Sequence, residues 1–444
     1  MYTSIDELQQ AVTGVLRLDG NTPRVTGEQT LREKIIDDLV FTAEFAADQA
    51  LKAKARSLIR QLAEALGIRS SSLHHYYLAI GKGEVPTTST VPAINIRTLT
   101  YDTARVLFKL KRELSIGPLI VEIARSEMGY TYQRPDDYAV AVLAAAIKEG
   151  YSGPVFLQGD HAQVNARRYT EDPAAETLQM KRLIQETIDA DFHNIDIDAS
   201  TLVDLSKATL DEQQVENYRV TAAFTEYIRS LETKGTISVG AEIGHIGGKN
   251  STPEELEAFL EGYNKALGNS VPGISKISVQ TGTSHGGIPL PDGSIADVQL
   301  DFSVLDNTGR VAREKYHLGG VVQHGASTLP NELFDQFPKH KTLEIHLATG
   351  FQNIIYDTMP DALRQDMYQW VENNRQEEWE AGLNREQFLY TTRKKKAFGP
   401  FRQRLWELSE QEKQPIREHL EQQFRFLFEK LNVVNTREAI EKYV

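Results

Sequence analysis

The sequence predicts a (β/α)8 barrel of the TIM type, an α/β fold, with helical extensions at its N- and C-terminal ends. From residue 91 onward, eight short β-rich segments alternate with amphipathic helical segments, the pattern of a parallel barrel. Several of the β-rich segments are followed directly by motifs that contain histidine, glycine or carboxylates. Active sites of such barrels gather at the carboxyl ends of the strands, so these motifs predict one shared site.

The expected strands are short apolar runs that end at polar or glycine residues. They cover Val91–Ile96, Pro118–Ala124, Pro154–Gly159, His193–Asp198, Thr236–Ile243, Lys276–Gly282, Leu318–Gln323 and Lys341–Leu347. The segments between them have helical spacing of apolar residues, and several begin at proline, which is favoured in the first turn. They cover Tyr101–Leu114, Pro135–Lys148, Pro173–Ala190, Asp211–Lys234 and Pro253–Leu267.

Composition shifts divide the chain into three parts. Residues 1–90 are expected to form a helical N-terminal extension, because Thr30–Leu66 is rich in strong helix formers at helical spacing. Residues 91–357 form the predicted barrel, and residues 358–444 a helical C-terminal extension. The extension carries one basic cluster, Arg393–Lys396. Such a cluster is usually a solvated face, and a contact to a distal substrate phosphate is the alternative.

The bulk composition limits the function. The 444 residues include 25% charged residues and carry a net charge of −13, which argues against a nucleic-acid surface. Cysteine is absent, so a metal would have to bind histidines and carboxylates, ligands that suit Zn²⁺ or another divalent first-row ion. We expect no membrane partner, because no long apolar run is present, and a cytoplasmic location.

Four strand-end motifs supply the candidate metal ligands. They are Gly159-Asp160-His161, Glu242-Ile243-Gly244-His245-Ile246-Gly247-Gly248, Ser284-His285-Gly286-Gly287 and Gln323-His324-Gly325-Ala326-Ser327. A catalytic zinc takes about three protein ligands and keeps a position open. His161, His285 and His324 are the expected ligands, with Glu242 as a fourth or alternate one.

Further polar residues are expected beside the metal ligands, in the barrel interior or at the surface. Asp160 either braces a loop or acts as an acid/base beside the metal, and Asp198 is expected to orient a ligand histidine. Asp196 is expected to be an interior polar residue. His245 is not an expected ligand, and a place in the metal's surroundings or in the substrate site is the minority interpretation for it. We expect His74, His75, His340 and His419 at the surface.

Small-residue turns after the last three strands predict a phosphate-binding region. These turns are Gly286-Gly287, Gly325-Ala326-Ser327 and Ala348-Thr349-Gly350. Glycine lets backbone N–H groups approach an anion closely, and the loops after strands seven and eight are a common phosphate position in such barrels. The alternative is that these are ordinary turns that connect each strand to the following helix.

Taken in order, these motifs resemble those of the class II (metal-dependent) fructose-bisphosphate aldolases and their tagatose-bisphosphate relatives. The resemblance covers about Pro92 to Asp357 and also includes Ala93-Ile94-Asn95-Ile96 and Leu300-Asp301-Phe302-Ser303. It implies a zinc-dependent barrel enzyme, dimeric or of higher order, that reversibly cleaves a ketose bisphosphate to dihydroxyacetone phosphate and an aldehyde. Fructose 1,6-bisphosphate, which would give glyceraldehyde 3-phosphate, is the expected substrate.

The resemblance also implies individual roles. His161, His285 and His324 would bind zinc, with Glu242 as an alternate ligand, and Asp160 would exchange the proton of the C4 hydroxyl. Positions that match the substrate-binding residues of the family are Asn95, Ser126, Gly286, Gly325, Ser327 and Thr349.

Two departures from the family pattern keep alternatives open. Lys249-Asn250-Ser251 stands where many members carry acidic residues that shuttle a proton, so the shuttle could be Glu254, Glu255 or His245. His346 and Ala348 stand where the family usually has Asn and Asp. The alternatives are a tagatose-bisphosphate or other sugar-phosphate aldolase, and a non-catalytic accessory subunit of an aldolase.

Overall fold

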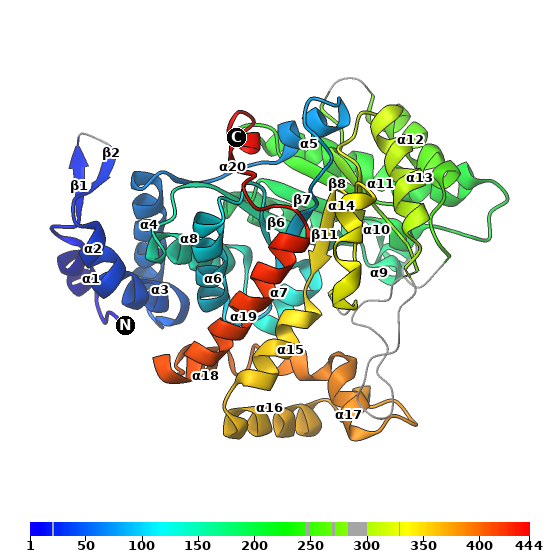
Figure 1. Cartoon of the computed structure of the whole chain (residues 1–444). Coiled ribbons are helices and arrows are strands. Elements are labelled where there is room, and N and C mark those ends of the chain that lie inside the picture. The colour runs from blue at the N-terminus through cyan, green and yellow to red at the C-terminus, as the bar shows by residue number, and fades with distance from the viewer. Residues whose placement is uncertain (20–21, 245–248, 269–270, 283–299, 328) are drawn as a thin grey trace.

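The computed structural model describes residues 1–19, 22–244, 249–268, 271–282, 300–327 and 329–444. Its centre is a closed barrel of eight parallel strands (Figure 1), so the predicted fold class is confirmed. Around the barrel the strand order is β6-β5-β4-β11-β10-β9-β8-β7, and a β6–β7 pairing closes the ring. The strands are β4 (Val91–Asn95), β5 (Ile120–Ala124), β6 (Gly153–Gln163), β7 (Asn194–Asp198), β8 (Ser238–Glu242), β9 (Lys276–Val279), β10 (Val321–Gln323) and β11 (Glu344–Leu347).

Strand β6 is longer than the sequence predicts. Its first residues also pair with β3 (Ile68–Ser70), which lies outside the barrel. Near its other end the register with β7 shifts between Gly159 and Ala162, as expected for a β-bulge. The bulge lies beside the candidate site and changes the direction of the side chains there.

Helices cover the barrel between successive strands. Their bounds follow the predicted segments closely, because prolines and capping boxes fix several of the N-termini. They are α6 (Thr100–Glu113), α7 (Arg125–Thr131), α8 (Pro135–Lys148), α9 (Ala166–Glu171), α10 (Pro173–Asp189), α11 (Leu210–Leu231), α12 (Pro253–Leu267), α13 (Phe302–Glu314), α14 (Gln336–Lys339) and α15 (Thr349–Thr358). Short 3-10 turns lie at Ser200–Leu202 and Asn331–Leu333.

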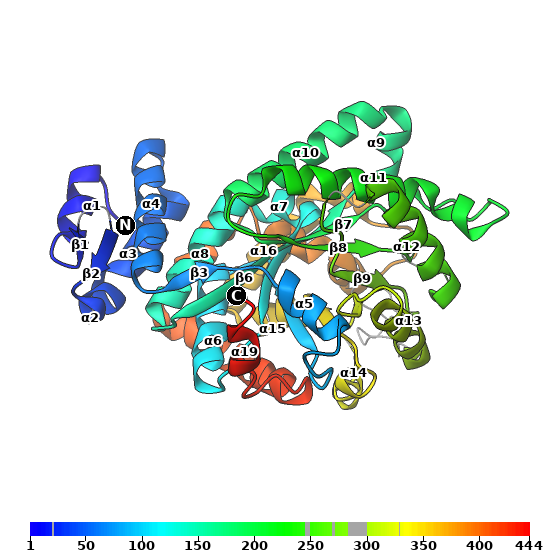
Figure 2. The ribbon, with the colours of Figure 1, turned by 90° about the horizontal axis from the view of Figure 1, so that it is seen from above.

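The N-terminal part is not wholly helical. A two-stranded antiparallel sheet of β1 (Leu16–Asp19) and β2 (Thr22–Val25) interrupts the helices. Helices α3 and α4 pack against α8, to one side of the barrel (Figure 2). The helical elements are α1 (Ile5–Val12), α2 (Glu28–Thr30), a π-helical turn (Leu31–Ile35), α3 (Ile36–Phe45), α4 (Gln49–Ala65) and α5 (His74–Gly81).

The C-terminal part folds back over the barrel. Helix α19 (Glu410–Lys430) packs against α6 and α15 (Figure 1), and Arg402 forms an ion pair with the buried Glu44 of α3. The two extensions therefore contact each other as well as the barrel. The remaining elements are α16 (Asp361–Asn374), α17 (Arg385–Phe388), α18 (Arg402–Trp406), α20 (Arg437–Glu441), 3-10 turns at Gln376–Glu378 and Lys394–Ala397, and a π-helical turn at Leu389–Arg393. Among the described helices, none combines the length and apolarity needed to cross a membrane.

Candidate active site

A cavity of about 360 Å³ opens at the carboxyl ends of the barrel strands. Its walls come from the ends of β4, β5, β6, β10 and β11 and from the C-terminal part. The lining residues include Asn95, Arg97, Glu122, Ser126, Glu127, Asp160, His161, His324, Gly325, Ser327, His346, Thr349, Gln352, Tyr390, Thr391 and Lys395. Most of the predicted site residues that the structure describes are in this set.

Three of the four predicted metal ligands lie together. One ligand atom from each of His161, Glu242 and His324 can be chosen so that all lie within 4.8 Å of one another. His161 Nδ1 is 2.9 Å from Glu242 Oε1, and the rings of His161 and His324 are 4.4 Å apart between centroids. His285, Gly286 and His245 lie outside the described residues.

The bulge in β6 explains how two adjacent residues reach the same site. In a regular strand Asp160 and His161 would point to opposite faces. His161 instead adopts a left-handed backbone conformation with φ of +40°, at the register shift between Gly159 and Ala162. Both side chains consequently line the cavity.

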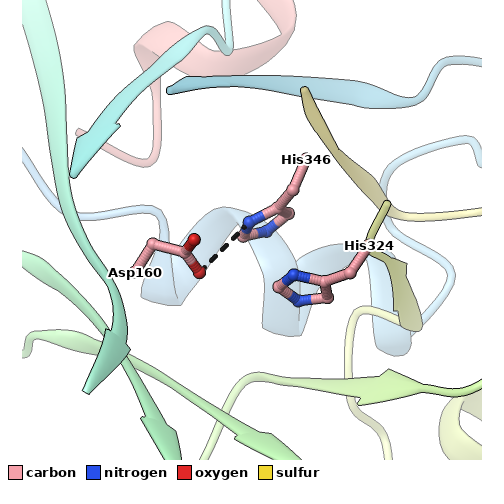
Figure 3. A group of neighbouring side chains, drawn as sticks. All are labelled: Asp160, His324 and His346. Carbon is pink, nitrogen blue, oxygen red and sulfur yellow. Dashed lines mark ion pairs between the residues drawn. The ribbon is translucent and has the colours of Figure 1, made fainter. Parts of the chain in front are cut away.

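Asp160 is 4% exposed and lies among imidazoles. Burial alone would raise the pKa of its carboxyl, but the positive charges of His161 and His346 hold the pKa well below its usual range. Asp160 Oδ1 is 3.3 Å from His346 Nδ1 (Figure 3). The carboxylate is therefore ionised near neutral pH and can accept a proton.

The carboxylates behind His161 fit a cation. Burial and the neighbouring Asp198 charge raise the pKa of Glu242 to about 7, and the contact with His161 lowers it in part. Asp198 Oδ2 is 3.5 Å from His161 Nδ1, the position expected of a residue that orients a ligand histidine. Two imidazoles, a carboxylate and an orienting carboxylate are a donor set that suits Zn²⁺.

Beneath these ligands the barrel interior is unusually charged. Lys276 is 1% exposed, and its Nζ lies 2.9 Å from Asp196 and also pairs with Glu344. Burial would lower the pKa of Lys276, but the two carboxylates raise it above its usual value. His346 Nε2 contacts Glu344 Oε1 at 2.6 Å. The sequence indicated Asp196 as interior but gave no role to this Lys276 network.

Two of the turns predicted to bind phosphate, those after β10 and β11, line one side of the cavity, and the Gly286-Gly287 turn lies outside the described residues. Gly325 has φ of +71°, a conformation that favours glycine. Ser327 Oγ accepts a hydrogen bond of 3.0 Å from the Thr349 backbone N–H. At Gly350 a Cβ would come 2.7 Å from the Ser327 carbonyl oxygen, so only glycine fits this close approach. The turns after β10 and β11 therefore form one unit.

The opposite side holds Asn95 and Ser126, together with residues that the sequence did not indicate. The Asn95 amide donates to Glu127 at 2.7 Å, while its Oδ1 is buried without a hydrogen bond among the described residues. Arg97 pairs with Glu127 at 2.7 Å and donates to Gln352 at 3.0 Å. Arg97 lies two residues after the end of β4, so its position near a strand end was a usable signal.

Residues from the C-terminal part complete the cavity. Tyr390, Thr391 and Lys395 line it, although more than 30 residues separate them from the predicted barrel. Lys395 Nζ lies 5.4 Å from the centre of the Tyr130 ring. The basic cluster thus contributes to the cavity wall in the same chain, and only tertiary docking could place it there.

Neither of the two glutamates offered as proton shuttles lines this cavity. Glu254 is exposed in the first turn of α12. Glu255 is buried and accepts a 3.0 Å hydrogen bond from the Thr252 backbone N–H, and it pairs with Lys249 at 2.8 Å. Glu255 therefore caps α12 in this structure. The proton-shuttle roles of Glu254 and Glu255 stay predictions.

One expectation about the other histidines is wrong. His74, expected at the surface, is 3% exposed because α5 packs under the barrel. Burial lowers its pKa to about 3, with a smaller effect of Arg229. The sequence pattern His74-His75-Tyr76-Tyr77 does not show which of the two histidines faces inward, and His75 is the exposed one.

Comparisons with known proteins agree with this architecture. The family model described as class II fructose-bisphosphate aldolase matches residues 87–411, a range that includes the C-terminal residues of the cavity. A fructose-bisphosphate aldolase of Giardia intestinalis is 24% identical over 226 residues, which cover 50% of this chain and 57% of that protein. The match therefore spans less than two thirds of that relative.

Two solved structures are also similar. A probable tagatose 6 phosphate kinase from Sinorhizobium meliloti 1021 has a TM-score of 0.53 and 13% identity, covering 80% of this chain and 98% of that one. A fructose-bisphosphate aldolase from Campylobacter jejuni has a TM-score of 0.49 and 15% identity, covering 83% and 96%. The first of these supports the fold alone. The family match covers most of the chain, and the protein belongs to the class II fructose-bisphosphate aldolase family.

Proposed function

We propose that this protein is a divalent-metal-dependent aldolase that reversibly cleaves a ketose bisphosphate, with fructose 1,6-bisphosphate as its substrate. The products would be dihydroxyacetone phosphate and glyceraldehyde 3-phosphate. The observation that carries the proposal is the joint placement of His161, Glu242 and His324 beside the buried, ionised Asp160.

The proposed chemistry divides between the metal and the side chains. When bound by His161, His285 and His324, with Glu242 as an alternate ligand, Zn²⁺ would act as a Lewis acid that polarises the C2 carbonyl. Asp160 would accept the proton of the C4 hydroxyl as the bond between C3 and C4 breaks. Its low pKa keeps this carboxylate ionised, and so able to take up a proton, near neutral pH.

The two ends of the substrate would be held by different walls of the cavity. Gly325, Ser327 and Thr349, with Gly286, would bind the phosphate of the dihydroxyacetone phosphate half. Ser126 would contact the other phosphate, with Lys395 as a cation from the C-terminal part. Asn95 would contact the substrate through its unpaired Oδ1.

The test is an aldolase assay with purified, metal-loaded protein. Release of dihydroxyacetone phosphate is followed by coupled oxidation of NADH, with fructose 1,6-bisphosphate and tagatose 1,6-bisphosphate as substrates. Activity should disappear with a chelator and return with Zn²⁺. Failure to cleave either ketose bisphosphate, in protein shown to contain metal, would reject the aldolase proposal.

A second candidate is an accessory aldolase subunit without activity of its own. It is favoured by Glu254 and Glu255 lying outside the cavity lining and by His346 in place of the usual Asn. This candidate predicts a stable complex with a second protein and no turnover alone. An active homo-oligomer or monomer would reject it.

A further inference from the structure

Cleavage of the proposed substrate needs a proton donor as well as the proton acceptor Asp160. When the bond between C3 and C4 breaks, its electron pair stays on C3, and Asp160 takes the proton of the C4 hydroxyl. C3 becomes the hydroxymethyl carbon of dihydroxyacetone phosphate only after it has received a proton of its own. Glu254 and Glu255 are not among the residues that line the cavity, so this second proton still needs a donor.

We propose that Glu122, on the floor of the cavity, donates this proton to C3 and takes it back in the reverse reaction. Glu122 is in the middle of β5 and lines the cavity. In the strand register it pairs with Asn95, whereas Asp160 pairs with Ala124, two residues further along β5. Glu122 therefore points into the barrel one layer beneath Asp160, at the level of Asn95, which is expected to contact the substrate. The inference rests on the proposed function.

The carboxyl of Glu122 is only partly engaged by its neighbours. Its side chain is fully buried. Oε2 accepts a hydrogen bond of 2.9 Å from the Gln158 amide and lies 3.2 Å from His346 Nδ1. Oε1 makes no hydrogen bond among the described residues, so it is the oxygen that can carry and deliver a proton. None of these described contacts is with an expected metal ligand.

The surroundings of Glu122 suit a group that both gives and takes a proton. Burial raises the pKa of its carboxyl, the charges of Asp160 and Glu344 raise it further and that of His346 lowers it, which leaves the pKa at about 7. Such a carboxyl is present in both its protonated and its ionised form near neutral pH, where general acids and bases work best. The interior layers of such barrels are usually filled by apolar side chains, so a carboxyl in this layer is unusual.

The other carboxyl and imidazole groups of the cavity are less suited to this step. Both oxygens of Glu127 are occupied, because Oε1 accepts from Arg97 and Oε2 accepts from Asn95. Both ring nitrogens of His346 lie beside carboxylates, so neither is directed at the substrate. Asp160 is the ionised proton acceptor, and the two remaining imidazoles are expected metal ligands.

The step conserves protons and electrons. In cleavage the O–H bond of Glu122 breaks, a C–H bond forms at C3 with the electron pair of the broken C3–C4 bond, and Glu122 becomes a carboxylate. Asp160 gains one proton from the C4 hydroxyl in the same turnover. Both carboxyls line one cavity, so water that enters after the products leave can carry the proton from Asp160 back to Glu122.

The test follows hydrogen exchange of dihydroxyacetone phosphate in D2O by NMR, with metal-loaded protein and no aldehyde. This half-reaction uses the proton of C3 but not that of the C4 hydroxyl. The wild type should replace one of the two hydrogens on the hydroxymethyl carbon with deuterium. Glu122→Gln should slow this exchange by about 10²–10⁴-fold, whereas Asp160→Asn, which is expected to lose cleavage, should retain it.

The controls separate loss of the proton donor from misfolding. Glu122→Asp keeps a carboxyl and should restore part of the exchange. Glu176→Gln changes a glutamate that is 1% exposed and pairs with Arg125 but is not among the cavity-lining residues, and it should leave the exchange unchanged. Thermal unfolding checks each fold. Normal exchange in Glu122→Gln, or loss of exchange in Glu254→Gln or Glu255→Gln in its place, would overturn the inference.

Two further measurements need no turnover. Glu122→Gln should bind Zn²⁺ as tightly as the wild type in calorimetry, and weaker binding would mean that Glu122 serves the metal instead of C3. The infrared difference spectrum between the two proteins should show the C=O stretch of a protonated carboxyl at pH 5 and not at pH 9, and its absence at pH 5 would also overturn the inference. Exchange that depends on Glu122, in a protein that cleaves neither ketose bisphosphate, would reject the proposed function alone.

Discussion

Replacing Lys276 with methionine should strongly destabilise the barrel. Lys276 is fully enclosed, donates to Gln158 at 2.8 Å and pairs with Asp196 and Glu344. Methionine fills a similar volume but leaves both carboxylates without their cation. Removing one partner of a buried ion pair costs about 3–5 kcal/mol, so we expect the free energy of unfolding to fall by about that amount at pH 7.

The loss should shrink as the pH falls. The lysine keeps the pKa of Glu344 at about 2, against the opposing effect of burial. Without the lysine, this buried carboxyl takes up a proton in the folded state that the unfolded chain does not bind above pH 5. One such proton changes stability by about 1.4 kcal/mol per pH unit, so the defect at pH 5 should be about 2–3 kcal/mol smaller than at pH 7.

The assay is urea unfolding at pH 5 and pH 7, with two further variants. Adding Glu344→Gln to Lys276→Met removes one uncompensated charge and should recover part of the loss. Lys109→Met removes a half-exposed lysine that pairs with Glu421 at 2.8 Å and should cost less than about 1 kcal/mol. The reasoning fails if Lys276→Met costs no more than Lys109→Met, or if its defect is the same at both pH values.

Three further predictions concern the site and its surroundings. Asp160→Asn should lower kcat for ketose bisphosphate cleavage by about 10²–10⁴-fold without lowering Tm, and unchanged kcat would remove Asp160 from proton transfer. Lys395→Met should lower kcat/KM by about 10–100-fold through loss of a charge-assisted contact. The Lys396 ammonium lies equally close to the Tyr130 ring, but Lys396 is not among the cavity-lining residues, so Lys396→Met should leave kcat/KM unchanged. Equal effects of the two substitutions would contradict the proposed contact. Because burial lowers the pKa of His74 to about 3, the unfolded chain binds a proton there between about pH 3 and 6.5 that the folded chain does not. His74 therefore contributes a loss of stability as the pH falls through that window. In urea unfolding from pH 7 to 4, His74→Leu should show a slope shallower by up to about 1.4 kcal/mol per pH unit, and an unchanged slope would refute the assignment.

The barrel could be predicted because its signals are local. Helices α8 and α12 begin at Pro135 and Pro253 and end where predicted, since first-turn proline and apolar spacing act within a few residues. The β1–β2 pair was missed. Its strands have four residues each, too short for a clear alternation, and β2 is placed by contacts with α4.

The same distinction holds for the candidate site. Asp160, His161, Glu242 and His324 could be indicated because strand ends in a parallel barrel meet at one edge. The alternating sequence Glu344-Ile345-His346-Leu347 indicated the inward direction of His346, because side chains two residues apart on a strand share one face. Lys395 had no such signal, because its position depends on how the C-terminal part docks.

The pairing of β11 with β4 joins the last barrel strand along the chain to the first, and it has a consequence for synthesis of the chain. About 250 residues separate Asn95 from Glu344, which a ribosome adds in roughly 12–50 s at 5–20 residues per second. During that interval the edge of β4 that β11 will cover has no strand beside it. Exposed strand edges recruit other chains. Nascent chains of this protein should therefore depend on chaperones until β11 emerges from the ribosome. We expect them to aggregate first on crowded polysomes.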